Sequence, residues 1–332
     1  MEGDTPEKVI HGGTARRIEA VLGARILDFS ASLNPAPPAI PHDLPWDHLT
    51  SYPDDSYTTL RETISGLFGR SVREIAIGNG SIEILRIFCA AVFSPGDRYV
   101  TFEPTFGEYD LSARLAGADR NGNGPVRVTF LCNPNNPTGT LVSRDTVLSV
   151  LDRCRQEGGI LFLDEAFIEL SDDPSQSLAD LRDPHLFVLR SLTKSYSVPG
   201  IRFGFGFGDP SLVKRLEILR PPWSVNAFAE TIALEAFRHT RELDWSRRII
   251  REEREWIIGK LRPFSIHITP SQTNFLLLTF PYDVAPLCND LLEHGVLVRD
   301  CHSFGLPCSI RIAVRTREEN ERLIEAFSAC LH

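Results

Sequence analysis

The chain has 332 residues, of which 42% are apolar, enough to build a large α/β unit or a large and a small domain with packed cores. Its 35 basic and 44 acidic residues give a formal net charge of -9, which repels phosphate backbones and anionic membrane surfaces. These values argue against a disordered chain, a nucleic-acid partner and a membrane partner. A small-molecule enzyme is the leading class.

The sequence carries no sign of export, membrane insertion or metal binding. Its first four residues include no basic patch, and the most apolar stretch, residues 84–93, is short and contains Arg86. The seven cysteines show no Cys-x-x-Cys spacing, and Cys301, His302 and Cys308 match no standard zinc site. We therefore expect a cytoplasmic protein with reduced thiols and no metal.

Short β-branched or aromatic runs alternate with amphipathic stretches, which predicts a parallel sheet with helical crossovers. The predicted strands cover residues 74–77, 98–102, 126–132, 160–164, 186–190 and 203–207, and helices fall between them. Beyond residue 223 the pattern changes to helices at 227–237 and 241–261, strands near 274–280, 296–299 and 309–314, and a helix from Thr316.

This order of elements predicts an α/β fold in which a large domain holds a mostly parallel central sheet and a smaller α+β domain follows. The proline-rich stretch 34–45 cannot be helical, and we expect it to cross into the large domain. The predicted divisions are an amino-terminal segment (1–40) that joins the small domain, the large domain (41–222) and the small domain (223–332).

A candidate phosphate site lies at residues 78–81, Gly-Asn-Gly-Ser, which end one predicted strand and open a helix. Free backbone N–H groups and the positive end of the helix dipole face this point. The same run is also typical of an ordinary turn with an N-cap, so alone it does not establish a ligand.

Two further strand ends carry polar side chains. Residues 132–139, Cys-Asn-Pro-Asn-Asn-Pro-Thr-Gly, stop a strand and fix Asn136 at the carboxyl end of the sheet, where open α/β sheets bind ligands. Asp164 ends the buried strand 160–164. Two interpretations of Asp164 stay open, a helix N-cap or a buried carboxylate stabilised by a cationic partner.

Lys194 is the one lysine, of four in the chain, that lies outside a plainly amphipathic or terminal segment. Hydroxyl groups at Ser191 and Thr193 precede it, and Arg202 follows eight residues later. This setting favours a lysine that forms an imine over a surface lysine. Together with a carboxylate for a ring nitrogen, an amide for a ring oxygen and a phosphate site, it indicates pyridoxal phosphate.

These motifs resemble fold-type-I pyridoxal-phosphate enzymes of the aminotransferase superfamily. Within that superfamily they resemble the group of histidinol-phosphate aminotransferases and threonine-phosphate decarboxylases, over essentially the whole chain. The resemblance implies that Lys194 is the Schiff-base lysine and that Asp164 is the catalytic partner of the pyridinium nitrogen. It also implies that Asn136 lies on the ring hydroxyl and that Phe106 stacks on the ring.

The same resemblance implies where the cofactor phosphate is held. Its site would consist of Ser81, Ile82, Ser191 and Arg202. Tyr52 resembles the tyrosine that reaches the phosphate of the neighbouring subunit, which implies a homodimer with shared active sites.

Three stretches, residues 11–13, 28–35 and 298–304, resemble the decarboxylase subgroup. One position departs from the superfamily: Phe167 stands where a tyrosine often donates a hydrogen bond to the ring hydroxyl. Hydrogen bonding to the hydroxyl of the electron-accepting ring would therefore depend more on Asn136. The form Asp-Glu-Ala-Phe at residues 164–167 resembles that of the decarboxylases.

The resemblance also implies a substrate site. His11, Gly12 and Arg299 would bind the phosphate end of the substrate, and Ser32 stands at a contact position where asparagine is expected. Arg311 would form a bidentate fork on the substrate carboxylate, a geometry that favours arginine over lysine. Asn136 completes this set.

The expected function is pyridoxal-phosphate-dependent decarboxylation of L-threonine O-3-phosphate to (R)-1-aminopropan-2-yl phosphate in cobalamin biosynthesis. The alternative is a histidinol-phosphate aminotransferase or a related class I/II aminotransferase. Both substrates carry an amine and a phosphate, so the two site lists nearly coincide. What separates the reactions is which bond at the α-carbon stands perpendicular to the ring. A pyridoxal-phosphate-binding regulator would need a DNA-binding module, for which the length and charge leave no room.

Overall fold

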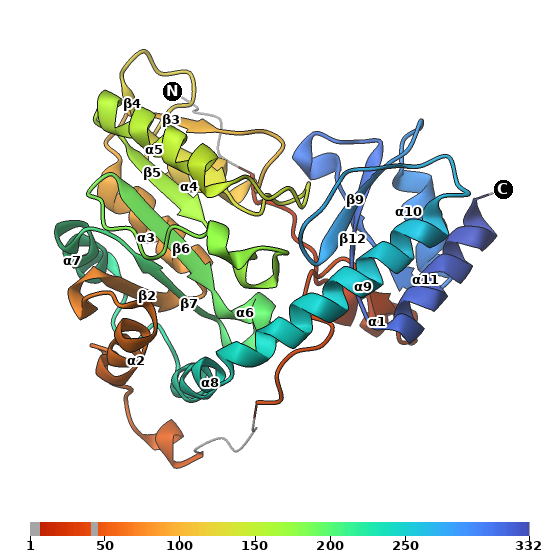
Figure 1. Cartoon of the computed structure of the whole chain (residues 1–332), viewed down its shortest axis with the longest axis horizontal. Coiled ribbons are helices and arrows are strands. Elements are labelled where there is room, and N and C mark those ends of the chain that lie inside the picture. The colour runs from red at the N-terminus through yellow and green to blue at the C-terminus, as the bar shows by residue number, and fades with distance from the viewer. Residues whose placement is uncertain (1–6, 41–45, 332) are drawn as a thin grey trace.

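The computed structural model describes residues 7–40 and 46–331, and its largest sheet has six strands in the order β2-β7-β6-β5-β4-β3 (Figure 1). Neighbouring strands pair in parallel, except that β7 runs antiparallel to β2 and β6. The strands are β2 (Ile75–Asn79), β3 (Arg98–Thr101), β4 (Val126–Cys132), β5 (Ile160–Asp164), β6 (Leu186–Ser191) and β7 (Phe203–Phe207). This mostly parallel sheet confirms the predicted α/β fold.

The central strands are runs of Val, Leu, Ile and Phe because helices cover both faces of the sheet. One apolar core contains side chains of α3 (Ser81–Val92), α4 (Glu108–Leu115) and α7 (Pro210–Leu219). The core on the other face contains side chains of α2 (Thr58–Phe68), α5 (Arg144–Glu157) and α8 (Ala227–Arg238).

A second, antiparallel sheet has the order β11-β12-β9-β8. Its strands are β8 (His267–Ile268), β9 (Phe275–Thr279), β11 (Arg299–Asp300) and β12 (Ser309–Ala313). The core beside it contains residues of α9 (Leu243–Leu261), α10 (Ala285–Glu293) and α11 (Arg317–Cys330). After α1 (Ala15–Leu22), the amino-terminal segment joins this unit, since β1 (Leu27–Asp28) pairs in parallel with β10 (Val296–Leu297).

The predicted strands at 126–132, 160–164 and 203–207 are confirmed to the residue. The strand expected at 296–299 is instead two short strands, β10 and β11, which belong to different sheets. An extended apolar pattern shows that a segment is a strand but not which neighbours it pairs with. The helix expected at 241–261 begins as a 3-10 turn over Thr240–Glu242, and α9 follows it.

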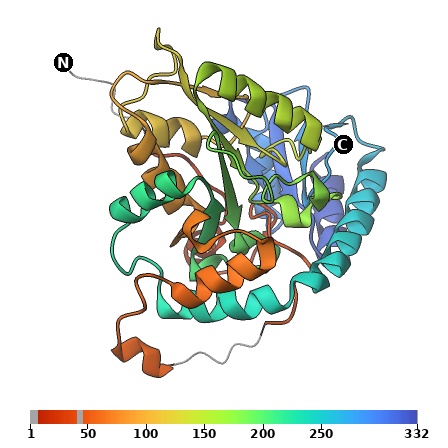
Figure 2. The same cartoon turned by 60° about the vertical axis from the view of Figure 1, so that its left-hand side comes forward.

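Helix α9 connects the two cores, since Leu243 at its start packs in the core shared with α8, and Ile257 and Leu261 near its end pack in the second core. Figures 1 and 2 show α9 leaving α8 and running to the second sheet. We therefore propose that the division between the two units falls within α9 rather than at residue 222. Within the described ranges, no helix is long and apolar enough to cross a bilayer.

Candidate active site

Six candidate residues lie at one edge of the six-stranded sheet because of its strand directions. The parallel strands β4, β5 and β6 end there, so Asn136 follows β4, while Asp164 and Ser191 are the last residues of β5 and β6. Strand β2 ends at the same edge, and the antiparallel strand β7 starts there. Ser81 after β2 and Arg202 before β7 therefore reach this edge too, and Phe106 follows β3 nearby.

These residues surround a cavity of about 400 Å³ that also receives side chains from the second sheet and from the amino-terminal segment. The cavity is lined by every predicted site residue except Tyr52: His11, Gly12, Ser32, Ser81, Ile82, Phe106, Asn136, Asp164, Ser191, Lys194, Arg202, Arg299 and Arg311. Segments separated by up to about 300 residues thus meet at one site.

Asp164 is only 5% exposed, and its carboxylate accepts two hydrogen bonds. Oδ2 accepts from the Tyr109 hydroxyl at 2.6 Å, and Oδ1 accepts from the backbone N–H of Ala166 at 2.9 Å. Burial raises the pKa of the Asp164 carboxyl above its ordinary value. The nearby charge of Lys194 lowers the pKa of Asp164, but within the described chain no Lys, Arg or His lies close enough to form an ion pair with it. The hydrogen bond from the Ala166 N–H is typical of a helix N-cap, whereas the hydrogen bond from the Tyr109 hydroxyl has no part in capping a helix.

Lys194 lies in the short helix α6 (Leu192–Ser195) with its amine among like charges. Burial, with the positive charges of Arg311 and Arg202, lowers the pKa of Lys194 to about 8. Its Nζ lies 5.8 Å from the centre of the Phe167 ring and forms neither a hydrogen bond nor an ion pair with the residues that the structure describes. The lowered pKa increases the fraction of this amine that is uncharged and nucleophilic near neutral pH.

The residues predicted to hold the cofactor phosphate contribute backbone groups as well as side chains. Gly80, at φ 78°, lies so close to Arg202 that a Cβ there would stand 2.6 Å from the guanidinium NH2. A Cβ on Gly204 would lie 2.4 Å from the backbone nitrogen of Ser81. Arg202 itself has φ 57°, a conformation that costs a non-glycine residue about 1–2 kcal/mol. The first turn of α3 and a guanidinium thus converge, as a phosphate requires.

The Ser191 hydroxyl lies beside the same point, hydrogen-bonded to the Thr193 hydroxyl at 2.9 Å. Ile82 follows Ser81 in the first turn of α3. Both line the cavity, so the predicted phosphate group of four residues is brought together.

Arg311 projects from β12 into the cavity and is 6% exposed. It donates from NH1 to Asn136 Oδ1 and from NH2 to the Ser30 carbonyl oxygen at 2.9 Å, and burial lowers its pKa to about 10. In the described structure its Nε and the Ser32 Oγ are buried without a hydrogen-bond partner. Buried polar atoms left this way point to a ligand that satisfies them.

The amino-terminal segment closes the outer side of the cavity. A Cβ on Gly12 would lie 2.3 Å from the Ser30 carbonyl oxygen, so only glycine fits there, and the His11 ring centre lies 5.8 Å from that of Phe106. Arg299 donates from NH2 to the Ile10 carbonyl oxygen at 2.8 Å and to the Ser303 hydroxyl at 2.6 Å. Arg299 therefore holds the amino-terminal segment, and its contact with a substrate phosphate stays a prediction.

Two residues of the site were missed in the sequence. Tyr109 is fully buried, donates to Asp164 and packs edge-on against Phe106, with the ring centres 5.6 Å apart. Glu108 binds His11 and Arg86. Their sequence signal is their position two and three residues after Phe106, in a segment where a crossover helix is expected.

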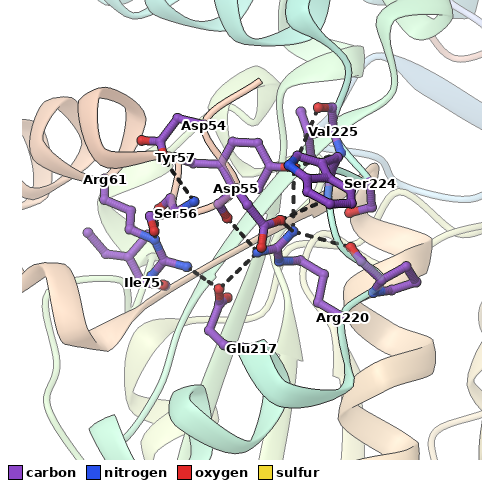
Figure 3. A network of polar contacts seen from close by, with 12 residues as sticks. Asp54, Asp55, Ser56, Tyr57, Arg61, Ile75, Glu217, Arg220, Ser224 and Val225 are labelled. Carbon is purple, nitrogen blue, oxygen red and sulfur yellow. Dashed lines mark hydrogen bonds and ion pairs between the residues drawn. The ribbon is translucent and has the colours of Figure 1, made fainter. Parts of the chain in front are cut away.

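Tyr52 lies outside the cavity on the surface, 80% exposed, with its ring centre 4.6 Å from that of Trp223. The chain on both sides of this pair is anchored by Asp55, whose Oδ1 accepts from the Trp223 backbone N–H at 2.7 Å and from Arg220 at 3.2 Å (Figure 3). Tyr57 adds a bond, since its hydroxyl accepts from the Val225 backbone N–H at 3.0 Å. Hydrogen bonds thus tie the backbone beside Tyr52, and Tyr52 does not line the cavity of its own chain.

The residues present fit pyridoxal phosphate. A buried carboxylate that forms no ion pair suits a protonated ring nitrogen, and an amine of lowered pKa suits the cofactor aldehyde. Asn136 offers its amide NH2 to a ring oxygen, since its Oδ1 already accepts from Arg311. The helix terminus with Arg202 suits the dianionic phosphate.

Comparison with known proteins identifies the family. The sequence model described as "Aminotransferase class I and II" matches residues 46–121 and 118–327. A histidinol-phosphate aminotransferase of Symbiobacterium thermophilum is 32% identical over 299 residues, which cover 85% of this chain and 82% of that protein. The crystal structure of the histidinol-phosphate aminotransferase from Clostridium acetobutylicum has a TM-score of 0.82 at 27% identity, covering 92% of this chain and 98% of that one.

The L-threonine-O-3-phosphate decarboxylase of Porphyromonas gingivalis has a TM-score of 0.76 at 23% identity, covering 86% of this chain and 92% of that one, which shows a shared fold. The expected phosphothreonine decarboxylase function in cobalamin biosynthesis is wrong, because the relatives at 32% identity are histidinol-phosphate aminotransferases. The error has a physical reason: both reactions use the same lysine, aspartate and phosphate contacts. The chain belongs to the class I and II aminotransferases, a family of enzymes that depend on pyridoxal phosphate.

Proposed function

We propose that the protein is an aminotransferase whose amino donor carries a phosphate monoester, histidinol phosphate, and whose acceptor is a 2-oxo acid. The observation that carries this proposal is one cavity in which the amine of Lys194, the buried carboxylate of Asp164 and the buried guanidinium of Arg311 meet. The names of the relatives support the choice of substrate.

The bound cofactor supplies an aldehyde that takes up the substrate amine and a ring that accepts electrons. Lys194 Nζ would hold the cofactor. When its amine is free, the same nitrogen could accept a proton from the substrate α-carbon, since its pKa of about 8 suits a general base near neutral pH.

Asp164 keeps the ring nitrogen protonated, and Tyr109 keeps Asp164 charged. The hydroxyl of Tyr109 lowers the pKa of Asp164 against the effect of burial, and it fixes the direction of the carboxylate. Tyr109 is therefore a positioning residue for the electron-accepting ring.

Arg311 is placed to bind the carboxylate of the acceptor. Histidinol phosphate has a phosphorylated hydroxymethyl group in place of the α-carboxylate of an amino acid, so the 2-oxo acid is the substrate that brings an α-carboxylate to this guanidinium. Asn136 and the Ser30 carbonyl each accept one hydrogen bond from its NH2 groups, which leaves Nε–H and the second N–H of each NH2 group for the carboxylate.

We further propose that two copies form a dimer in which Tyr52 reaches the cofactor phosphate of the partner subunit. The 80% exposure of Tyr52 and the exposed ring of Trp223 beside it support this proposal. So does the Asp55–Arg220 contact that holds their backbone. A closed two-fold pairing gives each copy the same contact.

The purified enzyme should form glutamate from histidinol phosphate and 2-oxoglutarate. Arg311→Met should raise the KM for 2-oxoglutarate about 10- to 100-fold, because a charge-assisted hydrogen bond is lost, and should affect the KM for histidinol phosphate less. Amino-acid analysis of the products checks the first result and initial-rate kinetics check the second. Absence of glutamate, with CO2 released from phosphothreonine instead, would contradict the proposal.

Tyr109→Phe should reduce turnover about 10- to 100-fold, since one hydrogen bond to a charged group is lost. Without this donor the pKa of Asp164 rises further, so the acidic limb of the pH–rate profile should move to higher pH. Tyr99→Phe is the matched control, because Tyr99 is also buried and donates to Asp110, outside the cavity. Equal effects of the two substitutions would refute the role of Tyr109.

The rate at which the apoenzyme takes up pyridoxal phosphate should rise with pH and level off above about 8, because only the uncharged amine of Lys194 reacts. Arg311→Gln removes a neighbouring positive charge, so the pKa of Lys194 should rise and the pH midpoint of the uptake rate should move upward. Arg248→Gln, which removes an exposed guanidinium stacked on Trp245, should leave it in place. Stopped-flow absorbance measures the rate. A rate that keeps rising toward the ordinary lysine pKa of 10.5 would count against the account.

Mixing inactive Lys194→Ala and Tyr52→Ala chains should restore activity at about a quarter of the sites. Half of the dimers in a statistical mixture are mixed, and each has one site with an intact lysine and an intact partner tyrosine. Subunit exchange is verified by mass spectrometry of tagged chains. If the Tyr52 variant is inactive alone and verified exchange restores nothing, the shared site is disproved.

A further inference from the structure

A second cavity, of about 250 Å³, lies at the end of β6 on the other side of the strand from the active site. Successive side chains of a strand point to opposite faces, so Arg190 points away from the active-site cavity and its guanidinium lies over the ring of Phe68 in α2. Ser191, the next residue, borders both cavities. We call this cavity the rear pocket, and its walls include Phe68, Glu169, Arg190, Phe205, Phe237 and Leu243.

The guanidinium of Arg190 is 7% exposed and forms no hydrogen bond with residues 7–40 or 46–331. Its Nε and NH1 are enclosed without an acceptor. NH1 forms ion pairs with Glu165 Oε2 at 3.3 Å and with Glu169 Oε1 at 3.4 Å. Arg190 therefore has charge partners but no hydrogen-bond acceptor, and a buried donor in this state points to a ligand.

Glu169 places an acceptor next to this donor. Its backbone is fixed, since the carbonyl oxygen accepts from Arg247 NH1 at 2.8 Å. Its carboxylate accepts only a long hydrogen bond, from the Ser195 hydroxyl at 3.5 Å, although two carboxylate oxygens can accept about four. The rear pocket thus presents a guanidinium donor and a carboxylate acceptor side by side.

The charges in the rear pocket favour a ligand without net charge. Arg190 already pairs with the carboxylates of Glu165 and Glu169, so an added anion would meet two negative groups and an added cation would meet the guanidinium. A neutral group that has an acceptor and a donor close together matches both Arg190 and Glu169.

The remaining walls and the volume favour a single aromatic ring. The ring centre of Phe205 lies 5.7 Å from that of Phe68 and 5.5 Å from that of Phe237, and aromatic rings pack well against such edges and faces. An apolar cavity of about 150 Å³ can hold benzene. The 250 Å³ of the rear pocket therefore has room for one ring and a small polar group.

We propose that the rear pocket is a second binding site, which takes a small uncharged aromatic molecule with a carboxamide or an equivalent donor–acceptor pair. The carbonyl oxygen of the ligand accepts from Arg190, and its N–H donates to Glu169. This site goes beyond the proposed function and does not depend on the substrate of the enzyme. The competing view is that water alone fills the rear pocket.

The test titrates benzamide and benzoate into the holoenzyme by calorimetry. The two probes have the same shape, but benzoate places a carboxylate against Glu169. Wild type should bind one benzamide per chain and should bind benzoate at this site at least about tenfold more weakly. Glu169→Gln replaces the acceptor with an amide that can also donate, so the preference for benzamide should fall about tenfold.

Leu67→Trp identifies the site of binding. Leu67 lies near the end of α2, lines the rear pocket and is 46% exposed, so a larger ring there should close the pocket without disturbing a core. Only binding that this substitution abolishes is assigned to the rear pocket, which separates it from binding of benzoate near Arg311. Leu115→Trp is the matched control, because Leu115 is 58% exposed and lines neither cavity.

Thr240→Trp provides a second way to close the rear pocket, since Thr240 lines it from the exposed turn after α8. Benzamide binding should be lost in both pocket variants and kept in Leu115→Trp. Absence of saturable benzamide binding below about 10 mM would show that water alone fills the rear pocket. Binding that survives both pocket substitutions, or an unchanged preference in Glu169→Gln, would also overturn the proposal.

Discussion

The buried charge of Asp164 is the constraint on which the rest of the site depends. The described chain gives its carboxylate two hydrogen-bond donors, Tyr109 and the backbone of Ala166, and the nearby charge of Lys194, but no ion pair. A carboxylate in this state is costly unless a positive group joins it, and a protonated ring nitrogen is such a group. Because Asp164 ends a central strand, it also fixes where the ring must lie, and Phe106, Asn136 and Lys194 have to surround that point.

One short segment after β3 serves three parts of the site. Phe106 faces the place of the ring, Tyr109 holds Asp164, and Glu108 binds His11. Adjacent residues on a helix point in different directions. The first turn of α4 can therefore contact Asp164 through Tyr109 and the amino-terminal segment through Glu108. Arg86 of α3 forms an ion pair with Glu108 in the same turn. This ion pair connects α3, whose first turn lines the cavity, to α4.

The sequence predicted the parts of this structure that depend on local pattern. Apolar runs predicted β4, β5 and β7, and the polar residues at strand ends placed Asn136 and Asp164 at one edge of the sheet, where both line the cavity. Lys194, predicted from the hydroxyl groups before it and Arg202 after it, lines the same cavity. Tyr109 was missed because its partner is 55 residues away, a contact that no periodicity reveals. The placement of α8 was missed for a similar reason, since its apolar face does not say which core it joins. The reaction was chosen wrongly because the same side chains serve both chemistries.

The ionisation of the ring nitrogen tests the central claim most directly. The enzyme is loaded with pyridoxal phosphate labelled with ¹⁵N in the ring, and the nitrogen chemical shift is measured in wild type and in Asp164→Asn. The account predicts a protonated ring nitrogen in wild type and an unprotonated one in the variant, because a neutral amide cannot balance the positive charge. An unprotonated nitrogen in wild type, or a protonated one in both proteins, would contradict it.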